Sequence, residues 1–243
     1  METVVEIEHL NKSFGSKEVL KDINIKIDKG ENLVVLGKSG SGKSVLIKCL
    51  VGLIVPDGGK IVLLGENILD LKERQLNVLR KRVGFLFQSA ALYDSMTVRE
   101  NLAFPLRDQK SKSKEETDAL VMEAITNVGL ADAIDKMPSE LSGGMRKRIG
   151  LARTLILKPE IILYDEPTTG LDPITSKEIS ELILDIQKKY NSASIIITHD
   201  VECARITANR MVVIKDGAVF AEGTFKELSE SKDEWVNSFF KHG

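Results

Sequence analysis

The segment Gly37–Ser44 has the composition and order of a phosphate-binding loop. It reads GKSGSGKS and matches the pattern G-x-x-x-x-G-K-S/T. Its glycines allow the backbone to curl so that successive N–H groups point at phosphate oxygens. Lys43 is expected to reach the β- and γ-phosphates, and Ser44 to offer its hydroxyl to Mg²⁺. We therefore predict that ATP and Mg²⁺ bind here, with contacts from Gly37, Lys38, Ser39, Gly40, Ser41, Gly42, Lys43 and Ser44.

Two adjacent carboxylates, Asp165 and Glu166, follow the apolar run Ile161–Tyr164. A buried strand does not normally end in two acids unless a cation or water engages them. Asp165 suits the coordination shell of Mg²⁺, and Glu166 would then orient or deprotonate the attacking water. Taken alone, such a pair is more often a solvated strand end, but the phosphate loop favours the functional interpretation.

Two further polar residues follow apolar runs. Gln88 comes after Val83–Phe87, and His199 comes after Ile195–Thr198. The carboxyl ends of parallel strands are where α/β folds bind ligands. We predict that the Gln88 amide contacts Mg²⁺ or the water, and that His199 is catalytic together with Lys43 and Glu166. A lone histidine is usually structural or merely exposed, and by itself each of these two signals is weak.

The segment Leu141–Met145, LSGGM, precedes a helix over residues 146–157. Ser142 and the N–H groups of Gly143 and Gly144 would open that helix and form a second anion site. The alternative is an ordinary helix cap. The basic run Arg146–Arg148 is most simply a solvated helix face, and contact with acidic lipid or nucleic acid is a weaker interpretation.

The elements that must hold these residues alternate between strand and helix patterns. Period-two alternation of Val5 with Ile7, and of Ile23 with Ile25 and Ile27, predicts half-buried strands. Apolar runs and helical spacing then predict strands and helices in alternation, which implies a largely parallel sheet. The predicted elements are Leu33–Leu36, Val45–Leu53, Lys60–Leu64, Val83–Phe87, Ile161–Tyr164, Ile174–Lys188 and Ile195–Thr198.

The middle and the end of the chain differ from this pattern. Helical spacing behind a capping box at Ser113–Glu116 predicts a mostly helical stretch, and Lys110–Glu116 is predicted to be a solvated loop. Lys215–Ala218 reads as a hairpin turn between two strands. Thr224–Glu227 is a second capping box, and an apolar stripe at helical spacing, Trp235–Phe240, follows.

The composition is that of an ordinary globular chain. Its 243 residues are 42% hydrophobic and 29% charged, with a formal net charge of −2, which argues against binding dominated by nucleic-acid phosphates. The two cysteines, Cys49 and Cys203, are predicted to be reduced core thiols. The first residues do not resemble a secretory signal, and the apolar runs are too short to span a bilayer.

Six short motifs occur in an order that resembles the ATP-binding subunits of ABC transporters over nearly the whole chain. They lie at Gly37–Ser44, Gln88, Leu141–Met145, Ile161–Glu166, Gly170–Asp172 and His199. The resemblance implies that Phe14 stacks on adenine, whereas the alternative for Phe14 is a buried strand residue. It also implies that Asp172 belongs to the family's D-loop and contributes to nucleotide binding.

The resemblance further implies a fold. We expect an α/β P-loop NTPase with a mostly parallel, RecA-like core sheet, an antiparallel β subdomain and a helical subdomain. A single ATP-binding domain would cover residues 1–243. Within it, the helical subdomain is expected at about residues 89–158 and a short C-terminal helical tail at about residues 224–243.

A closer resemblance is to the ATPases of the Mla, or MCE-linked, lipid-transport systems. It rests on Phe87–Val98, Glu100-Asn101, Phe104–Leu106, the segment LSGGMRKR and the tail Trp235–Gly243. Met145 stands where most ABC ATPases have glutamine, so the usual contacts of that side chain are not expected. The resemblance implies phospholipid transport between membranes, with an MCE-domain protein and a small STAS-type regulator as partners.

The family resemblance also implies a mechanism. Two copies would enclose two ATP molecules head to tail, each held by one copy's phosphate loop and by Ser142-Gly143-Gly144 of the other. Closure would drive an integral-membrane permease from the cytoplasmic face of the inner membrane. The loop Ala90–Phe104 would lie near the permease, and its simpler interpretation is local core. Nucleic acid is not an expected partner.

The alternatives concern the cargo and the coupled process. The same ATPase could energise transport of an amino acid, an ion or a lipoprotein, because other subunits choose the cargo. It could also drive cell-wall remodelling through a membrane partner. Nucleic-acid repair or translation is disfavoured, since ABC proteins of those kinds have tandem ATPase pairs or long coiled-coil or zinc insertions.

Overall fold

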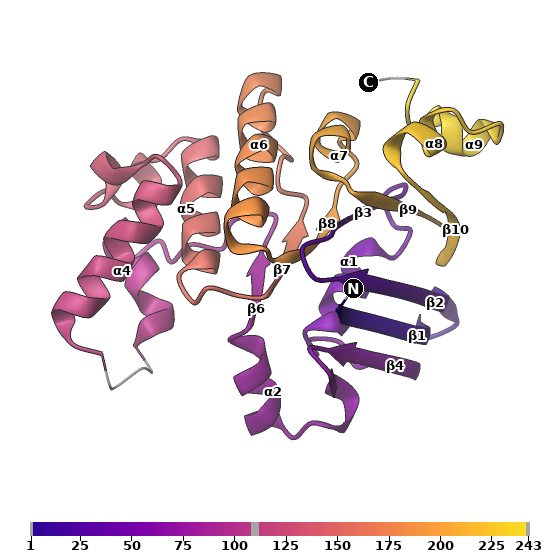
Figure 1. The fold of residues 1–243 in the computed structure, drawn as a ribbon, viewed down its shortest axis with the longest axis horizontal. Coiled ribbons are helices and arrows are strands. Elements are labelled where there is room, and N and C mark those ends of the chain that lie inside the picture. Colours follow the sequence, from indigo (N-terminus) through magenta and orange to yellow (C-terminus); the bar gives the residue numbers. More distant parts are fainter. Residues whose placement is uncertain (1, 108–111, 242–243) are drawn as a thin grey trace.

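The computed structural model describes residues 2–107 and 112–241. Its central element is a six-stranded sheet whose neighbouring strands are parallel except at the β10 edge (Figure 1). The strand patterns therefore predicted the parallel sheet correctly. In spatial order the strands are β10 (Ala218–Gly223), β9 (Arg210–Lys215), β3 (Asn32–Leu36), β8 (Ala193–Ile197), β7 (Ile161–Asp165) and β6 (Val83–Leu86).

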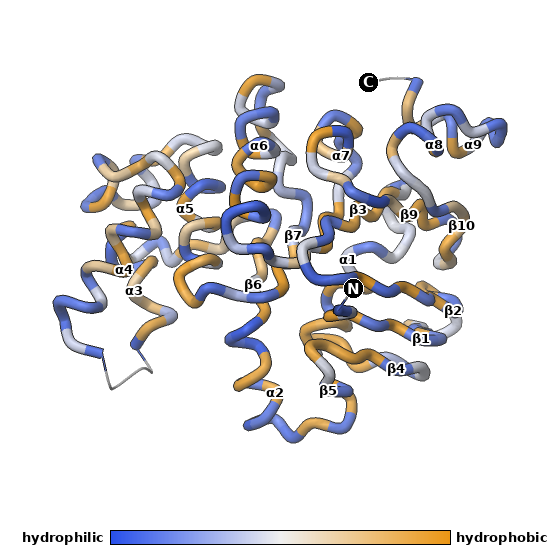
Figure 2. Tube along the Cα trace, viewed as in Figure 1, coloured by the Kyte–Doolittle hydropathy of each residue, from blue (hydrophilic) through white to orange (hydrophobic). Residues whose placement is uncertain are grey.

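A second, antiparallel sheet packs beside the first. Its order is β2 (Lys17–Asp28), β1 (Thr3–Phe14), β4 (Gly58–Leu63) and β5 (Glu66–Asn67). The register pairs apolar residues across β1 and β2, for example Val5 with Ile27 and Ile7 with Ile25. Figure 2 shows apolar and polar residues alternating along both strands, so one face of this sheet is buried and the other meets solvent.

The two faces of the parallel sheet belong to different apolar clusters. Leu33 and Val35 of β3 pack with the antiparallel sheet and with α1 (Lys43–Leu50), whereas Val34 and Leu36 point to the opposite cluster. That second cluster includes residues of α6 (Pro173–Tyr190) and α7 (Val201–Thr207). Because both faces are covered, β3, β7 and β8 are buried at every position.

Three helices lie together at one end of the molecule (Figure 1). They are α3 (Val98–Ala103), α4 (Lys114–Asn127) and α5 (Gly143–Leu155), and they share a third apolar cluster. Another helix, α2 (Glu73–Arg80), packs near β6. Short 3₁₀ turns occur at Ile68–Asp70, Phe104–Leu106, Ala131–Ala133 and Pro138–Glu140.

The prediction that Lys110–Glu116 is a loop was wrong at its C-terminal end. Lys114, Glu115 and Glu116 form the first turn of α4. Ser113 caps this helix, its hydroxyl accepting the N–H of Glu116 while the Glu116 carboxylate accepts the N–H of Ser113. These residues are exposed, as predicted, and the start of the segment lies outside the described residues.

The C-terminal segment forms α8 (Phe225–Ser229) and α9 (Glu234–Ser238). Val236 is buried, and Trp235, Phe239 and Phe240 pack against the cluster formed by the sheet, α6 and α7. The sequence left open which surface this stripe covers. In the structure the stripe packs against the core of its own chain.

Two expectations about the whole chain can be compared with the structure. Cys49 and Cys203 are free and buried, as predicted, and burial raises the pKa of each thiol to about 11. Among the described residues, the helices are all too short or too polar to cross a bilayer.

Candidate active site

The phosphate loop connects β3 to α1 and needs glycine at two positions for steric reasons. Gly42 precedes α1 with a φ of 104°, and a Cβ there would lie 2.6 Å from the carbonyl oxygen of Val19. A Cβ on Gly37 would lie 2.6 Å from Ser41 Oγ and 2.7 Å from the Ile214 carbonyl oxygen. Larger residues at these positions would push the loop away from the neighbouring strands β2 and β9.

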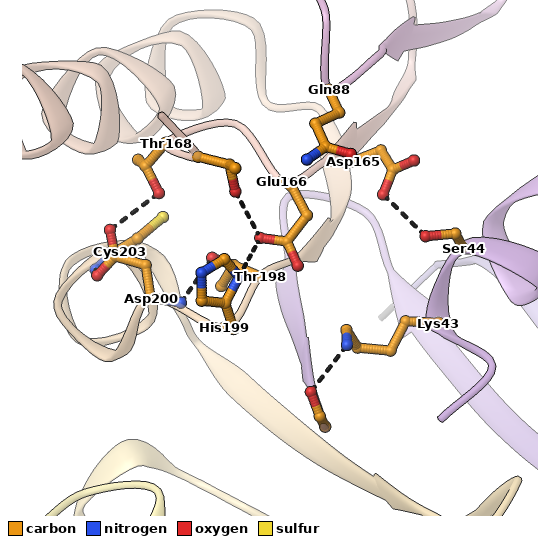
Figure 3. Close-up of polar contacts among 12 residues, drawn as sticks. Lys43, Ser44, Gln88, Asp165, Glu166, Thr168, Thr198, His199, Asp200 and Cys203 are labelled. Carbon is orange, nitrogen blue, oxygen red and sulfur yellow. Dashed lines mark hydrogen bonds and ion pairs between the residues drawn. The ribbon is translucent and has the colours of Figure 1, made fainter. Parts of the chain in front are cut away.

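Lys43 is the first residue of α1, and its side chain bends back across the loop. It is only 7% exposed, and its Nζ donates to the carbonyl of Gly37 at 2.8 Å (Figure 3) and to that of Lys38 at 3.2 Å. Burial lowers the pKa of Lys43, while the charges of Glu166 and Asp165 act in the opposite direction. The loop therefore encloses a buried cation, the complement of a phosphate group.

Asp165 and Ser44 meet at the carboxyl end of β7. The Ser44 hydroxyl donates to Asp165 Oδ1 at 3.3 Å, and the Gln88 amide lies close by in Figure 3. Burial is the main cause that raises the pKa of Asp165, and the hydrogen bond from Ser44 opposes it. All three side chains offer oxygen atoms, which are the ligands that Mg²⁺ prefers.

The described residues fit Mg²⁺ held together with a nucleotide. They contain no group of three or more histidine, cysteine or acidic side chains that could hold a metal alone. Mg²⁺ is commonly bound by one or two carboxylates plus substrate phosphates. In the same loop, Ser41 Oγ is buried without a hydrogen-bond partner, as expected for a polar group that faces a ligand.

Glu166 begins the turn after β7 in a left-handed backbone conformation, with a φ of 52°. Its N–H donates to the Ile197 carbonyl at 2.8 Å. Its carboxylate oxygen Oε2 lies 2.7 Å from His199 Nδ1 and accepts the Thr169 hydroxyl at 3.0 Å (Figure 3). The side chain is 14% exposed, so this carboxylate is sheltered yet reachable from the cavity.

Residues from six chain segments line one cavity of about 550 Å³. They include the loop residues Gly37–Gly40, Gly42, Lys43 and Ser44, together with Gln88, Glu166 and His199. The predicted phosphate, metal and catalytic groups thus lie together. These groups lie together because β3, β6, β7 and β8 are parallel and all end at the same edge of the sheet.

Phe14 and Asp172 are predicted nucleotide contacts that do not line this cavity, and Ser41 lines a second cavity that shares Lys38, Ser39 and Gly40 with it. Phe14 ends β1, is 50% exposed, and has Lys12 Nζ 5.3 Å from its ring centre. The alternative interpretation of Phe14 as a buried strand residue was therefore wrong. Asp172 caps α6 by accepting the N–H groups of Ile174 and Thr175, and hydrogen bonds from Thr175 are the main cause that lowers its pKa.

The LSGG segment also lies apart from the cavity of its own chain. Ser142 Oγ accepts the N–H of Met145 at 3.2 Å and caps α5, with Gly143 and Gly144 as its first two residues. A Cβ on Gly144 would lie 2.5 Å from Thr175 Cγ2, so α5 approaches α6 closely here. The Met145 side chain packs against the helical cluster, a site suited to an apolar group.

The interpretation of Arg146–Arg148 as a solvated face was wrong for Lys147, which is 5% exposed. Helical spacing was the missed signal, since Lys147 follows buried Gly144 by three residues and precedes buried Leu151 by four. Phe239 also lines the cavity, and no motif in the sequence pointed to it. Thr169, which holds the Glu166 carboxylate, was missed as well.

Comparison with protein families gives a match over residues 20–169 to the model described as ABC transporter. The matched segment includes the phosphate loop, Gln88, the LSGG segment and the acid pair.

Several named relatives are similar over nearly the whole chain. A probable ribonucleotide transport ATP-binding protein, mkl, of Mycobacterium leprae is 44% identical over 98% of this chain and 69% of its own length. The intermembrane phospholipid transport ATP-binding protein MlaF of Haemophilus influenzae is 38% identical over 99% of this chain and 91% of its own. The methionine import protein MetN of Rhizobium johnstonii is 40% identical over 91% of this chain and 61% of its own.

Solved structures of ABC ATP-binding proteins are also similar to this chain over most of its length. The dimeric ATP-binding cassette MJ0796 bound to ADP and phosphate superposes with a TM-score of 0.83 at 30% identity, covering 91% of this chain and 98% of that one. The cbiO1 protein of Clostridium perfringens, part of the ABC transporter complex cbiONQ, has a TM-score of 0.88 at 29% identity. That match covers 100% of this chain and 96% of the other.

Proposed function

We propose that this chain, which belongs to the family of ABC-transporter ATP-binding domains, energises a membrane permease that moves phospholipid between membranes. As a member of this family it binds ATP with Mg²⁺, hydrolyses ATP, forms dimers and works with a membrane permease. The cargo and the roles of individual residues are our proposals.

One observation supports the assignment of residues to the hydrolytic step. Glu166 Oε2 lies 2.7 Å from His199 Nδ1 in the cavity that also contains Lys43 and Ser44. We propose that Glu166 accepts a proton from the attacking water at its other carboxylate oxygen, Oε1, while His199 and Thr169 hold Oε2 and orient the carboxylate. Bound Mg²⁺ would stabilise negative charge on the phosphoryl oxygens, with Ser44, Asp165 and Gln88 holding it.

The second copy would complete each site. Ser142, Gly143 and Gly144 lie at the start of α5, where unpaired N–H groups attract anions, yet they do not line their own chain's cavity. We propose that they contact the nucleotide of the partner copy, and that exposed Asp172 and Phe14 join the site in the closed, ATP-bound dimer.

The cargo proposal is supported by the breadth of the likeness to MlaF. That alignment spans 99% of this chain and 91% of MlaF, a protein named for intermembrane phospholipid transport. An Arabidopsis chloroplast relative, 36% identical over 98% of this chain, is also named after a lipid, trigalactosyldiacylglycerol. On this basis we propose an MCE-domain protein and a small STAS-type regulator as partners, at the cytoplasmic face of the inner membrane.

A surface beside α3 suits the permease. Tyr93 is 43% exposed, its ring lies 4.5 Å from that of Phe104, and the Arg107 guanidinium lies 3.8 Å from the Phe104 ring. Val98 and Leu102 of the same segment are buried in the helical cluster, so the segment is partly local core. We propose that the exposed aromatic part receives a cytoplasmic helix of the permease.

The test is affinity capture of tagged protein from detergent-solubilised native membranes, with mass spectrometry of the proteins and lipids retained. We expect a multi-span permease, an MCE-domain protein and phospholipid. Tyr93→Ala should lose the permease, whereas Met122→Ala, which removes a 39%-exposed side chain from α4, should retain it. A solute permease without an MCE protein would refute the lipid proposal and leave the ATPase assignment intact.

The alternative supported by a specific observation is amino-acid import, because MetN is 40% identical over 91% of this chain. Nucleotide transport has similar support from mkl at 44% identity. The capture experiment separates these cases, since each predicts a solute permease in place of an MCE-domain protein.

A further inference from the structure

Lys147 is a buried cation that none of the nucleotide-binding motifs includes. It lies one turn into α5 and is 5% exposed. Its Nζ donates to the carbonyl oxygen of Gln88 at 2.6 Å and to that of Glu166 at 3.0 Å. One ammonium group therefore joins α5 to the residues that follow β6 and β7.

The contact with Glu166 fixes a backbone that is held in an uncommon conformation. Glu166 has a φ of 52°, a region that is unfavourable for a residue with a side chain. Its N–H is bonded to the Ile197 carbonyl, and its carbonyl is bonded to Lys147 Nζ. With both backbone polar groups bonded, the carboxylate is directed toward His199.

Lys147 also contacts Gln88, a second residue that lines the cavity. Lys147 binds its carbonyl, while the side chain of Gln88 lines the cavity near Asp165 (Figure 3). Burial is the main cause that lowers the pKa of Lys147, to about 8. The two carbonyls are the direct partners of this ammonium, and the charges of Glu166 and Asp165 oppose the lowering of its pKa.

A buried charge with only carbonyl partners is costly, and a methionine or leucine at this position of α5 would avoid that cost. The neighbouring basic residues do not contact the site. Arg146 donates to the Leu141 carbonyl, and Arg148 donates to the Val128 carbonyl and to Glu178. Among these three residues, only Lys147 donates to residues that line the hydrolytic cavity.

We propose that Lys147 is a positioning residue that transmits the position of α5 to Gln88 and Glu166 of the same chain. The start of α5 bears Ser142, which we propose contacts the partner's nucleotide. A shift of α5 when that contact forms would move the backbone of Glu166 through Lys147. Lys147 thereby couples the two ATP sites of a dimer, a step that rests on the proposed dimeric arrangement.

The test compares Lys147→Met, Lys147→Arg and the matched control Arg148→Met in the full chain. Lys147→Met should lower kcat about 10- to 100-fold, the size expected for a small displacement of a catalytic group. Its KM for ATP should stay within about twofold of the wild-type value, because the phosphate loop is untouched. Lys147→Arg, which can still donate to both carbonyls, should recover most of kcat.

The control variant Arg148→Met distinguishes a loss of catalytic positioning from a general loss of fold stability. Arg148→Met removes a cation of the same helix that also bonds a carbonyl, so its loss of melting temperature should be similar while kcat is retained. Equal kcat losses in the two methionine variants, or wild-type kcat in Lys147→Met, would overturn the proposal. If Lys147→Met does not fold, Lys147→Gln, which also removes the ammonium group, replaces it, and wild-type kcat in that variant would overturn the proposal.

The same measurements distinguish this inference from the proposed function. Wild-type protein without ATPase activity would contradict the ATPase assignment itself. Wild-type activity that is indifferent to Lys147 would contradict only the positioning role. Mixed dimers containing one Lys147→Met copy should show slowed hydrolysis in that copy, and unaltered rates there would also overturn the coupling.

Discussion

Replacing Glu166 with glutamine tests the proposed hydrolytic chemistry most directly. Glutamine keeps the shape of the side chain and can still bond His199 and Thr169, which lie 2.7 and 3.0 Å from Glu166 Oε2. It removes the negative charge and the ability to accept a proton from water. A general base contributes about 10²–10⁴-fold to a rate, which corresponds to about 3 to 5 kcal/mol of transition-state stabilisation.

We expect kcat to fall by that factor while ATP affinity stays close to the wild-type value. The groups that surround phosphate, Lys43 and the backbone from Gly37 to Ser44, lie in a different segment and keep their geometry. Because hydrolysis is slow, the ATP-bound dimer should accumulate. Phosphate release measures the first effect, and size-exclusion chromatography with ATP and Mg²⁺ measures the second.

The matched control is Glu178→Gln, which makes the same change at an exposed residue of α6 that bonds Arg148. Its turnover should equal that of the wild type. Wild-type turnover in Glu166→Gln would refute the role of Glu166 as the base. Loss of ATP binding in Glu166→Gln would also contradict our reasoning, since it would mean that the carboxylate organises the phosphate loop.

Two further predictions follow from the buried lysines. Lys43→Ala should weaken ATP binding about 10- to 100-fold, because a charge-assisted hydrogen bond contributes about 1.5–3 kcal/mol. Isothermal calorimetry would measure this loss of affinity, and an unchanged affinity would contradict the role of Lys43 in binding phosphate. The pKa of Lys147 is lowered to about 8 from its ordinary 10.5, so the unfolded chain binds more protons between those values. The free energy of unfolding of the wild type should therefore increase relative to that of Lys147→Arg as the pH rises from about 8 to about 10.5. Urea unfolding at several pH values would measure this difference. A difference that stays constant across that range would contradict the lowered pKa.

Local patterns in the sequence were sufficient to identify the phosphate loop, the acid pair and the parallel sheet. The loop depends on close contacts that only glycine permits at positions 37 and 42, so its chemistry is visible in residue types at fixed spacing. The fully apolar runs of β3, β7 and β8 indicated strands covered on both faces. The family resemblance added the order of the motifs, and the comparisons confirmed the family.

Other features depended on contacts between distant segments. The bond between Glu166 and His199 joins residues 33 positions apart, and it forms because β7 and β8 are neighbours in the sheet. Lys147 looks like one of three basic residues on a helix face, and only the packing of α5 against the ends of β6 and β7 buries it. The covering of the sheet by the C-terminal stripe was likewise not visible in the spacing of its residues.

Residue types at fixed spacing therefore determined which groups could bind phosphate and Mg²⁺, because that chemistry is local to a loop and a strand end. Beyond the local bonds from Thr169, the tertiary structure decided how Glu166 is oriented, because its backbone is also held by a carbonyl of β8 and an ammonium of α5. These partners come from segments that meet only after the sheet has formed and the helices have packed on it.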